Sequence, residues 1–335
     1  MAPLIHAEAL TKHYRRPRRF EGFLGGLRSL VTREYELVRA VDGISFAVET
    51  GELVAFLGPN GAGKSTTIKM MSGILVPSSG TLRVRGVAPW RDRERNALGI
   101  GVVFGQRSQL WWDLPLIDSF RLVGKLYRMP QGTFRRNLDR FVDLLDMGSF
   151  LDRPVRQLSL GQRMRGDLAA AMLYEPPLLY LDEPTIGLDS VAKERMRVFI
   201  EKINRESGTT IILTTHDLSD VERLCRRAIL IDRGTLVYDG GLDPLKAEYA
   251  PHRVLVAHLA PEGPAGEAPE VTLGDRFPGE LISQEGNVIR IGFKSSVTSA
   301  QEVISAFSAA YPILDLSITE PDLGGVLRRV YSDRE

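Results

Sequence analysis

The sequence predicts an α/β fold built on a buried parallel sheet, with a second, smaller domain at the C-terminal end. Residues 53–57 (LVAFL) form a short apolar run that leads through a glycine-rich turn into a segment with helical spacing, the strand–turn–helix order of α/β proteins. Residues 178–181 (LLYL) form another such run between Pro177 and Pro184, which suits a strand buried on both faces. The length of 335 residues allows about two domains.

The glycine-rich turn, residues 58–66 (GPNGAGKST), has the G-x-x-x-x-G-K-[ST] pattern of a phosphate-binding loop. Its glycines let the backbone fold tightly so that several N–H groups converge on an anion, and the helix that begins near Gly63 adds the positive end of its dipole. Lys64 supplies a positive charge for the β- and γ-phosphates, and the Ser65 hydroxyl is a hard oxygen ligand for Mg²⁺. A glycine-rich turn with an exposed lysine is the alternative, which the flanking strand and helix disfavour. The sequence therefore predicts a nucleoside triphosphate site whose contacts here are Gly58, Pro59, Asn60, Gly61, Ala62, Gly63, Lys64, Ser65 and Thr66.

Two adjacent acids, Asp182 and Glu183, follow the apolar run 178–181. Consecutive strand residues point to opposite sides, so these acids are best placed at the carboxyl end of a buried strand, where α/β sheets bind ligands. Asp182 is predicted to hold Mg²⁺ opposite Ser65, directly or through water, and Glu183 to orient and deprotonate the water that attacks the γ-phosphorus. An acidic loop that merely caps the strand is the alternative, and the phosphate-binding loop upstream makes it the weaker one.

Residues 158–162 (LSLGQ) lie between these two sites and start a helical segment. Ser159 with Gln162 three residues on is a capping box, and Pro176 marks that the helix has ended. The same Ser-capped helix, with free N–H groups and the glycine Gly161 for close approach, is also typical of a second phosphate-binding site. Two phosphate sites for one nucleotide per chain suggest that the second site serves the nucleotide of a neighbouring subunit.

These segments together make the chain similar to the nucleotide-binding subunits of ABC transporters over about residues 4–245. The family's motifs occur in the right order: the phosphate-binding loop 58–66, a glutamine loop around Gln106, LSLGQ at 158–162, LLYLDEP at 178–184, Gly-Leu-Asp at 187–189, and His216 after the strand-like run 211–215. Such a series of motifs is far more specific than any one of them. The resemblance implies a P-loop ABC-type ATPase core with a helical subdomain at about residues 106–176.

The resemblance also implies how the site is completed. Two subunits would sandwich two ATP molecules, so that Ser159 and Gly161 of one subunit contact the γ-phosphate held by Lys64 of the other. Asp189 would communicate across the interface, and His216 would sense the γ-phosphate. Gln106 would touch the metal and the attacking water while linking the site to a membrane partner. The resemblance thus implies catalytic roles for Glu183, His216 and Gln106, metal ligation by Ser65, Gln106 and Asp182, and nucleotide contacts by Ser159, Gly161, Gln162 and Asp189.

Two positions depart from the family pattern or leave it open. Leu160 stands where the family usually has glycine, and since Ser159 and Gly161 are intact we expect working chemistry with some altered packing. The aromatic residue that stacks on adenine at the end of the first strand is Tyr14 by its local context or Tyr35 by its distance to residues 40–42, and we prefer Tyr14. Ordinary packing is the alternative for either tyrosine.

Composition narrows the class of partner. The chain is 43% hydrophobic with a net charge of +1, which describes a globular protein with no strong electrostatic attraction to nucleic acid. Cys225 is the only cysteine of the sequence, which excludes an internal disulfide and points to a reducing compartment. No signal peptide and no apolar stretch of about 18 residues is visible. We therefore expect a peripheral subunit at the cytoplasmic face of the cell membrane, with the translocation pathway in separate permease subunits.

A soluble ABC-type ATPase that acts on ribosomes or DNA is the alternative function. Members of that class usually carry two nucleotide domains in one chain, long coiled coils or zinc sites. This chain has one phosphate-binding loop, no repeat, no heptad run and one cysteine. We therefore predict a transporter ATPase that binds ATP and Mg²⁺ and pairs with a second ATP-binding subunit, most simply its own copy.

Two further segments indicate the kind of transporter. Residues 15–39 form an arginine-rich insertion, and Phe23–Val31 within it has the spacing of a short basic amphipathic helix, which could contact anionic lipid or the permease, or pack on its own domain. Trp111 and Trp112 follow the glutamine loop, where the family's permease docks, and we expect one to be core and the other to face a partner. With LSLGQ, these features resemble the ABC-2-type exporter ATPases of the viologen and drug exporter group.

The tail is predicted to be a small accessory α+β domain, which gives two domains, 1–248 and 249–335. Strands are expected at residues 252–259, 287–293 and 313–318, and helices at 299–311 and 324–331. Nothing in this tail resembles a catalytic constellation. Subunit pairing, regulation and plain stabilisation stay open as its role.

Overall fold

The computed structural model describes residues 2–17, 35–105, 107–249, 252–260, 269–274, 277–294, 297–319 and 323–332. Contacts divide the chain into two compact units, Met1–Gly240 and Gly241–Glu335. The boundary expected between residues 248 and 249 falls inside helix α9 (Leu242–Tyr249). This helix contacts α11 (Leu323–Ser332) and belongs with it to the second unit, so the division comes before α9. Within these described ranges, no helix combines the length and apolarity needed to cross a membrane.

Among the described residues, the first unit contains a six-stranded sheet with the order β5-β6-β7-β3-β8-β9. Its strands are β3 (Leu53–Leu57), β5 (Ile100–Phe104), β6 (Leu178–Asp182), β7 (Thr210–Thr214), β8 (Arg227–Asp232) and β9 (Thr235–Gly241). The pairs β5·β6, β6·β7, β3·β7 and β3·β8 are parallel. All of β7 and all but the last residue of β6 are buried, as expected for strands covered on both faces. The predicted α/β fold is therefore confirmed, with the predicted strands at 53–57 and 178–181 on either side of β7.

A second sheet, with the order β2-β1-β4, is antiparallel. Strand β1 (Ile5–Pro17) pairs with both β2 (Tyr35–Val48) and β4 (Ser79–Val84). Helix α2 (Lys64–Met71) buries Ile68, Met70 and Met71 in a hydrophobic core that it shares with residues of both sheets. This shared core fixes the helix that follows the phosphate-binding loop.

The predicted insertion 15–39 begins and ends inside the β1–β2 pair. Arg15 lies opposite Leu37, and Pro17 lies opposite Tyr35. Both flanks of the insertion are therefore strand. The first strand continues to Pro17, past Tyr14, where the sequence suggested that it ends. Residues 18–34, with the predicted amphipathic helix, lie outside the described residues.

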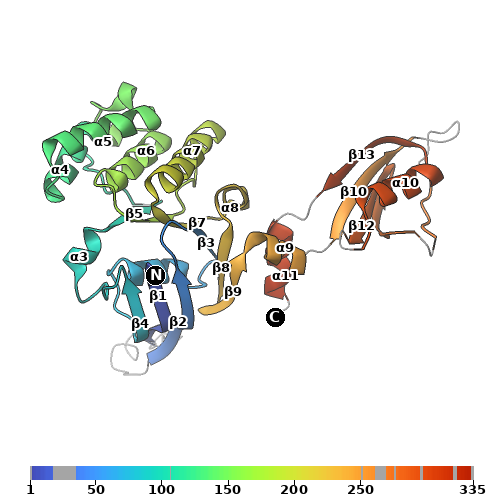
Figure 1. Cartoon of the computed structure of the whole chain (residues 1–335), viewed down its shortest axis with the longest axis horizontal. Helices are drawn as coiled ribbons and strands as arrows, with labels where there is room; N and C mark the ends of the chain where they lie inside the picture. Colours follow the sequence, from blue (N-terminus) through green and yellow to red (C-terminus); the bar gives the residue numbers. More distant parts are fainter. Residues whose placement is uncertain are drawn as a thin grey trace, which may run out of the picture. The chain divides into compact units, whose positions relative to one another are not determined.

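The predicted helical subdomain consists of α4 (Leu116–Leu126), α5 (Gln131–Leu144) and α6 (Leu160–Met172), with 3-10 turns at Gly148–Phe150 and Val155–Gln157 (Figure 1). Helix α6 contacts both α4 and α5, and Phe120, Phe141 and Phe150 are buried. The Phe141 ring meets Phe199 of α7 (Ser190–Ser207) edge to face, which links the subdomain to the rest of the unit. Helices α3 (Arg93–Ala97) and α8 (Leu218–Leu224) are shorter.

The second unit contains an antiparallel sheet with the order β11-β12-β10-β13. Its strands are β10 (His252–Leu259), β11 (Glu280–Glu285), β12 (Val288–Lys294) and β13 (Ile313–Thr319). Helix α10 (Ala300–Ala310) buries Val303 and Phe307 in the same core as Leu255 and Ile291 of the sheet. The predicted strands and helices of the tail match these elements to within a residue or two. Strand β11 was missed, because most of ELISQE is exposed and it has no apolar alternation.

Candidate active site

The phosphate-binding loop joins β3 to α2 as the sequence predicts. Gly63 is the N-cap of α2 and has φ 109°, and a Cβ there would lie 2.4 Å from the Ala40 carbonyl oxygen. Gly61 also has a positive φ, of 84°. Only glycine meets the steric and backbone demands at position 63. The turn thereby presents the first N–H groups of α2, and no acidic side chain lies in the first turn of that helix.

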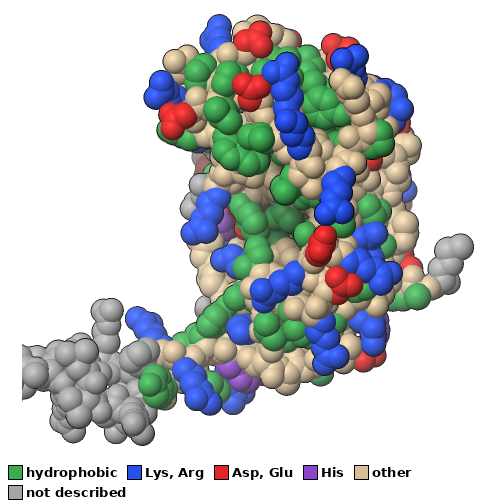
Figure 2. Space-filling view, turned by 90° about the vertical axis from the view of Figure 1, so that its left-hand side faces the viewer, with side chains coloured by type: hydrophobic (Ala, Val, Ile, Leu, Met, Phe, Trp, Pro, Cys, Tyr) green, Lys and Arg blue, Asp and Glu red, His purple; other side chains and the backbone are tan. Residues whose placement is uncertain are grey.

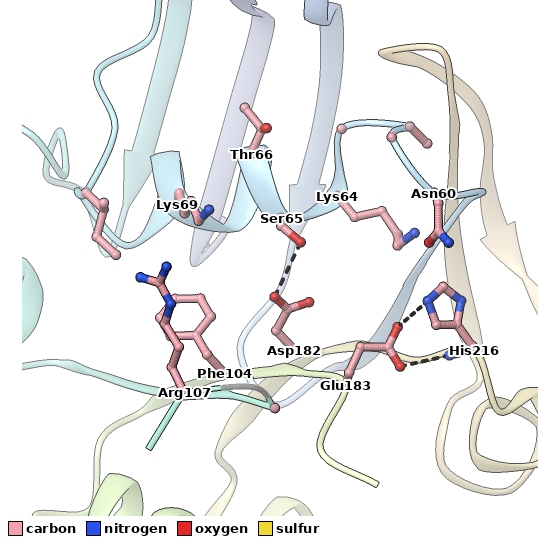
Figure 3. A pocket seen from close by; sticks show the side chains of 15 residues that line it. Asn60, Lys64, Ser65, Thr66, Lys69, Phe104, Arg107, Asp182, Glu183 and His216 are labelled. Atoms are coloured by element: carbon pink, nitrogen blue, oxygen red, sulfur yellow. Dashed lines mark hydrogen bonds and ion pairs between the residues drawn. The ribbon is translucent and has the colours of Figure 1, made fainter. Parts of the chain in front are cut away.

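A cavity of about 500 Å³ opens beside this loop (Figure 3). It is lined by Asn60, Gly61, Ala62, Gly63, Lys64, Ser65, Thr66, Lys69, Ile74, Phe104, Gly105, Arg107, Asp182, Glu183 and His216. Most of the residues predicted to hold or cleave the nucleotide within one chain are therefore gathered in one place. Gly58 and Pro59 do not line the cavity, although both accept hydrogen bonds from a residue that does.

The Lys64 side chain is only 8% exposed and lies back over its own loop. Its Nζ donates to the carbonyl oxygens of Gly58 and Pro59, at 2.6 and 3.1 Å. Burial lowers the pKa of Lys64, while the nearby carboxylates of Glu183 and Asp182 raise it. An anionic ligand in the cavity would favour the charged ammonium and offer it better acceptors than two carbonyl groups.

Asp182 is held between helix α2 and strand β7. Its Oδ2 accepts from the Ser65 hydroxyl at 3.3 Å, and its Oδ1 accepts from the Thr214 hydroxyl at 2.6 Å. A hydroxyl and a carboxylate that already meet are hard oxygen donors of the kind Mg²⁺ takes, and Mg²⁺ usually adds waters and phosphates to one or two protein ligands. Ser65 and Asp182 therefore fit Mg²⁺. Among the described residues no cluster of three or more His, Cys, Asp and Glu side chains could hold a metal.

Glu183 forms a corner just after β6. It has φ 56°, a left-handed conformation that is strained for a residue with a side chain and that often occurs at functional sites. Its N–H donates to the Thr214 carbonyl oxygen at 3.0 Å, which fixes the corner against β7. The side chain is 18% exposed and directed at the cavity (Figure 3).

The Glu183 carboxylate is paired with His216, which follows β7. One oxygen, Oε2, accepts from the His216 N–H at 3.1 Å, and the other, Oε1, lies 3.1 Å from His216 Nε2 (Figure 3). Burial raises the pKa of Glu183, while the neighbouring His216 lowers it. A half-buried carboxylate with a raised pKa, placed in a polar cavity, is suited to accept a proton.

The residues expected to act on a neighbouring subunit's nucleotide do not line this cavity. Ser159 and Gln162 form the predicted capping box of α6: the Ser159 hydroxyl accepts from the Gln162 N–H at 3.3 Å, and the Gln162 side chain accepts from the Ser159 N–H at 3.0 Å. Asp189 caps α7 by accepting from the Ala192 N–H at 2.8 Å. Gly161, Ser159, Gln162 and Asp189 thus lie at two helix starts away from the cavity of their own chain.

Leu160, the departure from the family pattern, packs over Gly187. A Cβ built on Gly187 would lie 2.8 Å from Leu160 Cδ2, and Gly187 has φ 71°. Leu160 therefore brings the LSLGQ segment into contact with the segment that leads to Asp189.

Three expectations have other outcomes. Neither Tyr14 nor Tyr35 lines the cavity; both are exposed on the β1–β2 pair, where Tyr14 lies opposite Val38. Gln106 lies outside the described residues. The expectation that one of Trp111 and Trp112 is core is wrong, because their exposed fractions are 41% and 52%. They lie at the start of the helical subdomain, where the Arg163 guanidinium rather than a hydrophobic core lies over the Trp112 ring, 5.5 Å from its centroid.

Sequence reasoning missed one end of the cavity. Lys69, Ile74, Phe104, Gly105 and Arg107 line it without having been predicted. Lys69 lies on α2 four residues after Ser65, on the same face of the helix, so helical spacing was an available signal. Phe104 and Arg107 line the cavity because β5 is the neighbour of β6, and the sequence did not show that order.

Comparison with known proteins defines the family. The ABC transporter family model matches residues 41–186. The chain is 31% identical over 210 residues to the ABC transporter ATP-binding protein NatA of Bacillus subtilis, covering 63% of this chain and 85% of NatA. It is 34% identical over 236 residues to the daunorubicin resistance ATP-binding protein DrrA3 of Streptomyces coeruleorubidus, covering 70% and 74%. It is 35% identical over 212 residues to the Nod factor export ATP-binding protein I of Ralstonia nicotianae, covering 62% of this chain but only 64% of that protein.

Solved structures agree with the sequence relatives. An ATP-binding subunit of an ABC transporter superposes with a TM-score of 0.62 at 26% identity, over 73% of this chain and 93% of the other. The ATP-binding cassette MJ0796, in a dimeric post-hydrolysis state bound to ADP and Pi, gives 0.59 at 25% identity, over 71% and 98%. The chain therefore belongs to the ATP-binding proteins of ABC transporters, and it is an ATPase with their P-loop fold.

Proposed function

We propose that this chain is the ATP-hydrolysing motor subunit of a membrane exporter, which dimerises around two ATP molecules and drives separate ABC-2-type permease subunits from the cytoplasmic face of the membrane. The observation that carries the proposal is that one chain supplies only part of the expected nucleotide site. One chain gathers Lys64, Ser65, Asp182, Glu183 and His216 at one cavity, while the LSLGQ helix start lies elsewhere. The names of two relatives, one for Nod factor export and one for daunorubicin resistance, support export.

The geometry of the cavity supports a role for each residue that lines it. The α2 N–H groups and Lys64 bind the phosphates. Ser65 and Asp182, with Gln106 as the family resemblance implies, would hold Mg²⁺, which would neutralise charge on the phosphates. Glu183 orients water and accepts its proton while a bond forms between the water oxygen and the γ-phosphorus, and the bond from that phosphorus to the β–γ bridging oxygen breaks. His216 positions Glu183 and contacts the γ-phosphate from the rim, where it is exposed.

The second half of each site comes from the other subunit in this proposal. Ser159, Gly161 and Gln162 at the start of α6 would contact the partner's γ-phosphate through the positive end of the helix, and Asp189 would lie across the interface. The dimeric form of the MJ0796 cassette supports this arrangement. A homodimer is the simplest form, because each chain carries both halves of the site, with Leu160 as the departure from the family pattern in the LSLGQ segment.

The permease would dock beside the glutamine loop, on a surface we call the docking surface, made of the exposed side chains Trp111, Trp112, Leu114 and Leu126. Figure 2 shows hydrophobic side chains exposed among lysines and arginines on the side of the molecule that carries α4 and α5. Exposed tryptophans are typical anchors of protein interfaces. A soluble ATPase acting on ribosomes or DNA is not favoured, since the named relatives are transporter subunits.

Replacing Glu183 tests the hydrolytic role. Glu183→Gln keeps the size and hydrogen-bonding oxygen of the side chain but cannot take up the water's proton, so turnover should fall at least on the order of a hundredfold while ATP binding stays nearly intact. ATP should then trap a dimer, detected by size-exclusion chromatography alongside phosphate-release assays. Lys64→Ala is the matched comparison and should weaken ATP binding itself. Phosphate release by Glu183→Gln within a few-fold of wild type would refute the assignment.

Mixed dimers test the shared site. Ser159→Arg should leave ATP binding to the monomer unchanged and block ATP-dependent dimerisation, because Ser159 serves the partner's nucleotide. Mixing Ser159→Arg and Lys64→Ala chains creates one site with both residues intact and one with both lost. In a Glu183→Gln background, such mixtures should therefore trap one ATP per dimer where neither variant alone traps any. Weakening of monomer ATP binding by Ser159→Arg as severe as that of Lys64→Ala would show that Ser159 acts within its own chain.

Purification from membranes tests the permease partner. The full chain should copurify from detergent-solubilised membranes with an integral membrane protein encoded beside it. Trp112→Ala should weaken that association by about 2 kcal/mol, roughly thirtyfold in Kd, with basal ATPase of the free subunit nearly unchanged. Val198→Ala removes an exposed apolar side chain from α7 and serves as the control. Recovery with ribosomes or DNA and with no membrane protein would contradict the transporter function.

A further inference from the structure

Asp167 is a buried acid that neither the nucleotide cavity nor any capping role uses. It lies on α6, two turns after Leu160, and is 3% exposed. Its Oδ1 accepts from the Ser108 hydroxyl at 3.0 Å and from the Gln109 N–H at 2.9 Å. The Gln109 side-chain amide donates back to the Asp167 carbonyl oxygen at 2.9 Å. Both the side chain and the backbone of Asp167 are therefore bonded to the chain just after the glutamine loop.

The packing around Asp167 reinforces these bonds. The Ser108 hydroxyl also accepts from the Leu110 N–H at 3.1 Å, which folds residues 108–110 into a compact turn. Leu110 is 7% exposed and lies against Gly166, where a Cβ would come within 3.0 Å of Leu110 Cδ1. Glycine at position 166 thus lets the turn sit close to the backbone of α6. We call this contact, between residues 108–110 and Gly166–Asp167, the clasp.

A carboxyl group is a costly choice for this place. Burial raises the pKa of Asp167 to about 6, while the hydrogen bonds from Gln109 and Ser108 and the charge of Arg163 lower it. A leucine or alanine at position 167 would avoid the desolvation but would leave the Gln109 N–H and the Ser108 hydroxyl without this acceptor. The carboxylate therefore serves to hold the turn 108–110 in place, because an apolar residue would suit the buried face of α6 but could not accept these two hydrogen bonds.

The clasp lies in the chain between three parts that the proposed function needs to connect: the nucleotide cavity, the docking surface and the LSLGQ segment. Residue 108 follows Arg107, which lines the nucleotide cavity. Residues 111 and 112 belong to the docking surface, and Trp111 is joined to α4 by a hydrogen bond from its N–H to Ser119 Oγ at 3.1 Å. Helix α6 begins at the LSLGQ segment. A clasp that stays closed would make these parts move together.

We infer that Asp167 is a positioning residue that fastens the turn 108–110 to α6, so that a permease bound at the docking surface moves the LSLGQ segment and thereby controls ATP turnover. The inference rests on the proposed function. A side chain that cannot accept the two hydrogen bonds would leave each nucleotide cavity intact but would separate turnover from permease binding.

The test compares Asp167→Ala with Asp167→Asn in the full chain, alone and with the copurified membrane protein. Asparagine keeps an oxygen acceptor at the same place, so Asp167→Asn should keep most of the stimulation of ATPase by the membrane protein. In Asp167→Ala, the stimulation factor, which is the ATPase rate with the membrane protein divided by the rate without it, should fall at least fivefold. Its basal kcat and its KM for ATP should stay within about twofold of wild type. Asp118→Ala, which removes an exposed acid paired with Arg121 on α4, is the matched control and should behave as wild type.

Ser108→Ala gives a second way to break the clasp should Asp167→Ala fold poorly. It removes the hydroxyl that donates to Asp167 and accepts from the Leu110 N–H, and it keeps the bond from the Gln109 N–H to Asp167, so it should lose part of the stimulation. Full stimulation of Asp167→Ala or of Ser108→Ala, or equal losses of basal and stimulated turnover, would overturn the inference and leave the exporter function standing.

Hydrogen exchange provides a readout that needs no membrane protein. In the free subunit, the Gln109 and Leu110 amides should exchange at least tenfold faster in Asp167→Ala than in wild type, and close to the wild-type rate in Asp167→Asn. Unchanged exchange at these amides would overturn the clasp, whether or not a permease is recovered. If exchange is faster as expected but no membrane protein copurifies, the failed copurification counts against the exporter function and not against the clasp.

Discussion

The carboxylate of Asp182 holds together the elements on which the site depends. One oxygen accepts from Ser65 at the start of α2 and the other from Thr214 at the end of β7. These contacts are available because β6, β7 and β3 are neighbours in a parallel sheet, so their carboxyl ends lie at one edge. Glu183 and His216 come immediately after β6 and β7, and the same constraint brings them within hydrogen-bond distance of each other.

The same geometry leaves the site incomplete within one chain. The start of α6 carries Ser159 and Gly161 but does not reach the cavity, and Ser159 and Gln162 satisfy each other in a capping box. In the proposed dimer, a phosphate held by the second subunit would compete for these groups, which would make dimerisation depend on bound nucleotide. Asp167 lies on the same helix and is bonded to the turn beside the docking surface, so α6 is the element through which a membrane partner would act.

Local sequence patterns predicted the parts of the site that one strand–turn–helix unit creates. Lys64 and Ser65 are placed by the glycines before them, and Asp182 by the apolar strand that it ends. Features that depend on how distant segments pack were missed. Arg107 lines the cavity only because β5 is next to β6, and both tryptophans after the glutamine loop are exposed although an aromatic pair suggested one core residue. Adenine stacking by Tyr14, or by Tyr35 as the alternative, stays a prediction, because the two tyrosines share the β1–β2 pair and neither lines the cavity.

Equilibrium binding of ATP to the monomer, with and without Mg²⁺, tests the role of Asp182 most directly. Wild type should bind ATP at least tenfold more tightly with Mg²⁺ than without, because Ser65 and Asp182 would supply hard oxygen ligands to the ion. Asp182→Asn keeps the shape of the side chain and removes its charge, so it should bind Mg²⁺-free ATP about as well as wild type and lose most of the gain from Mg²⁺. An Asp182→Asn chain that keeps the full Mg²⁺ dependence of wild type would contradict the account.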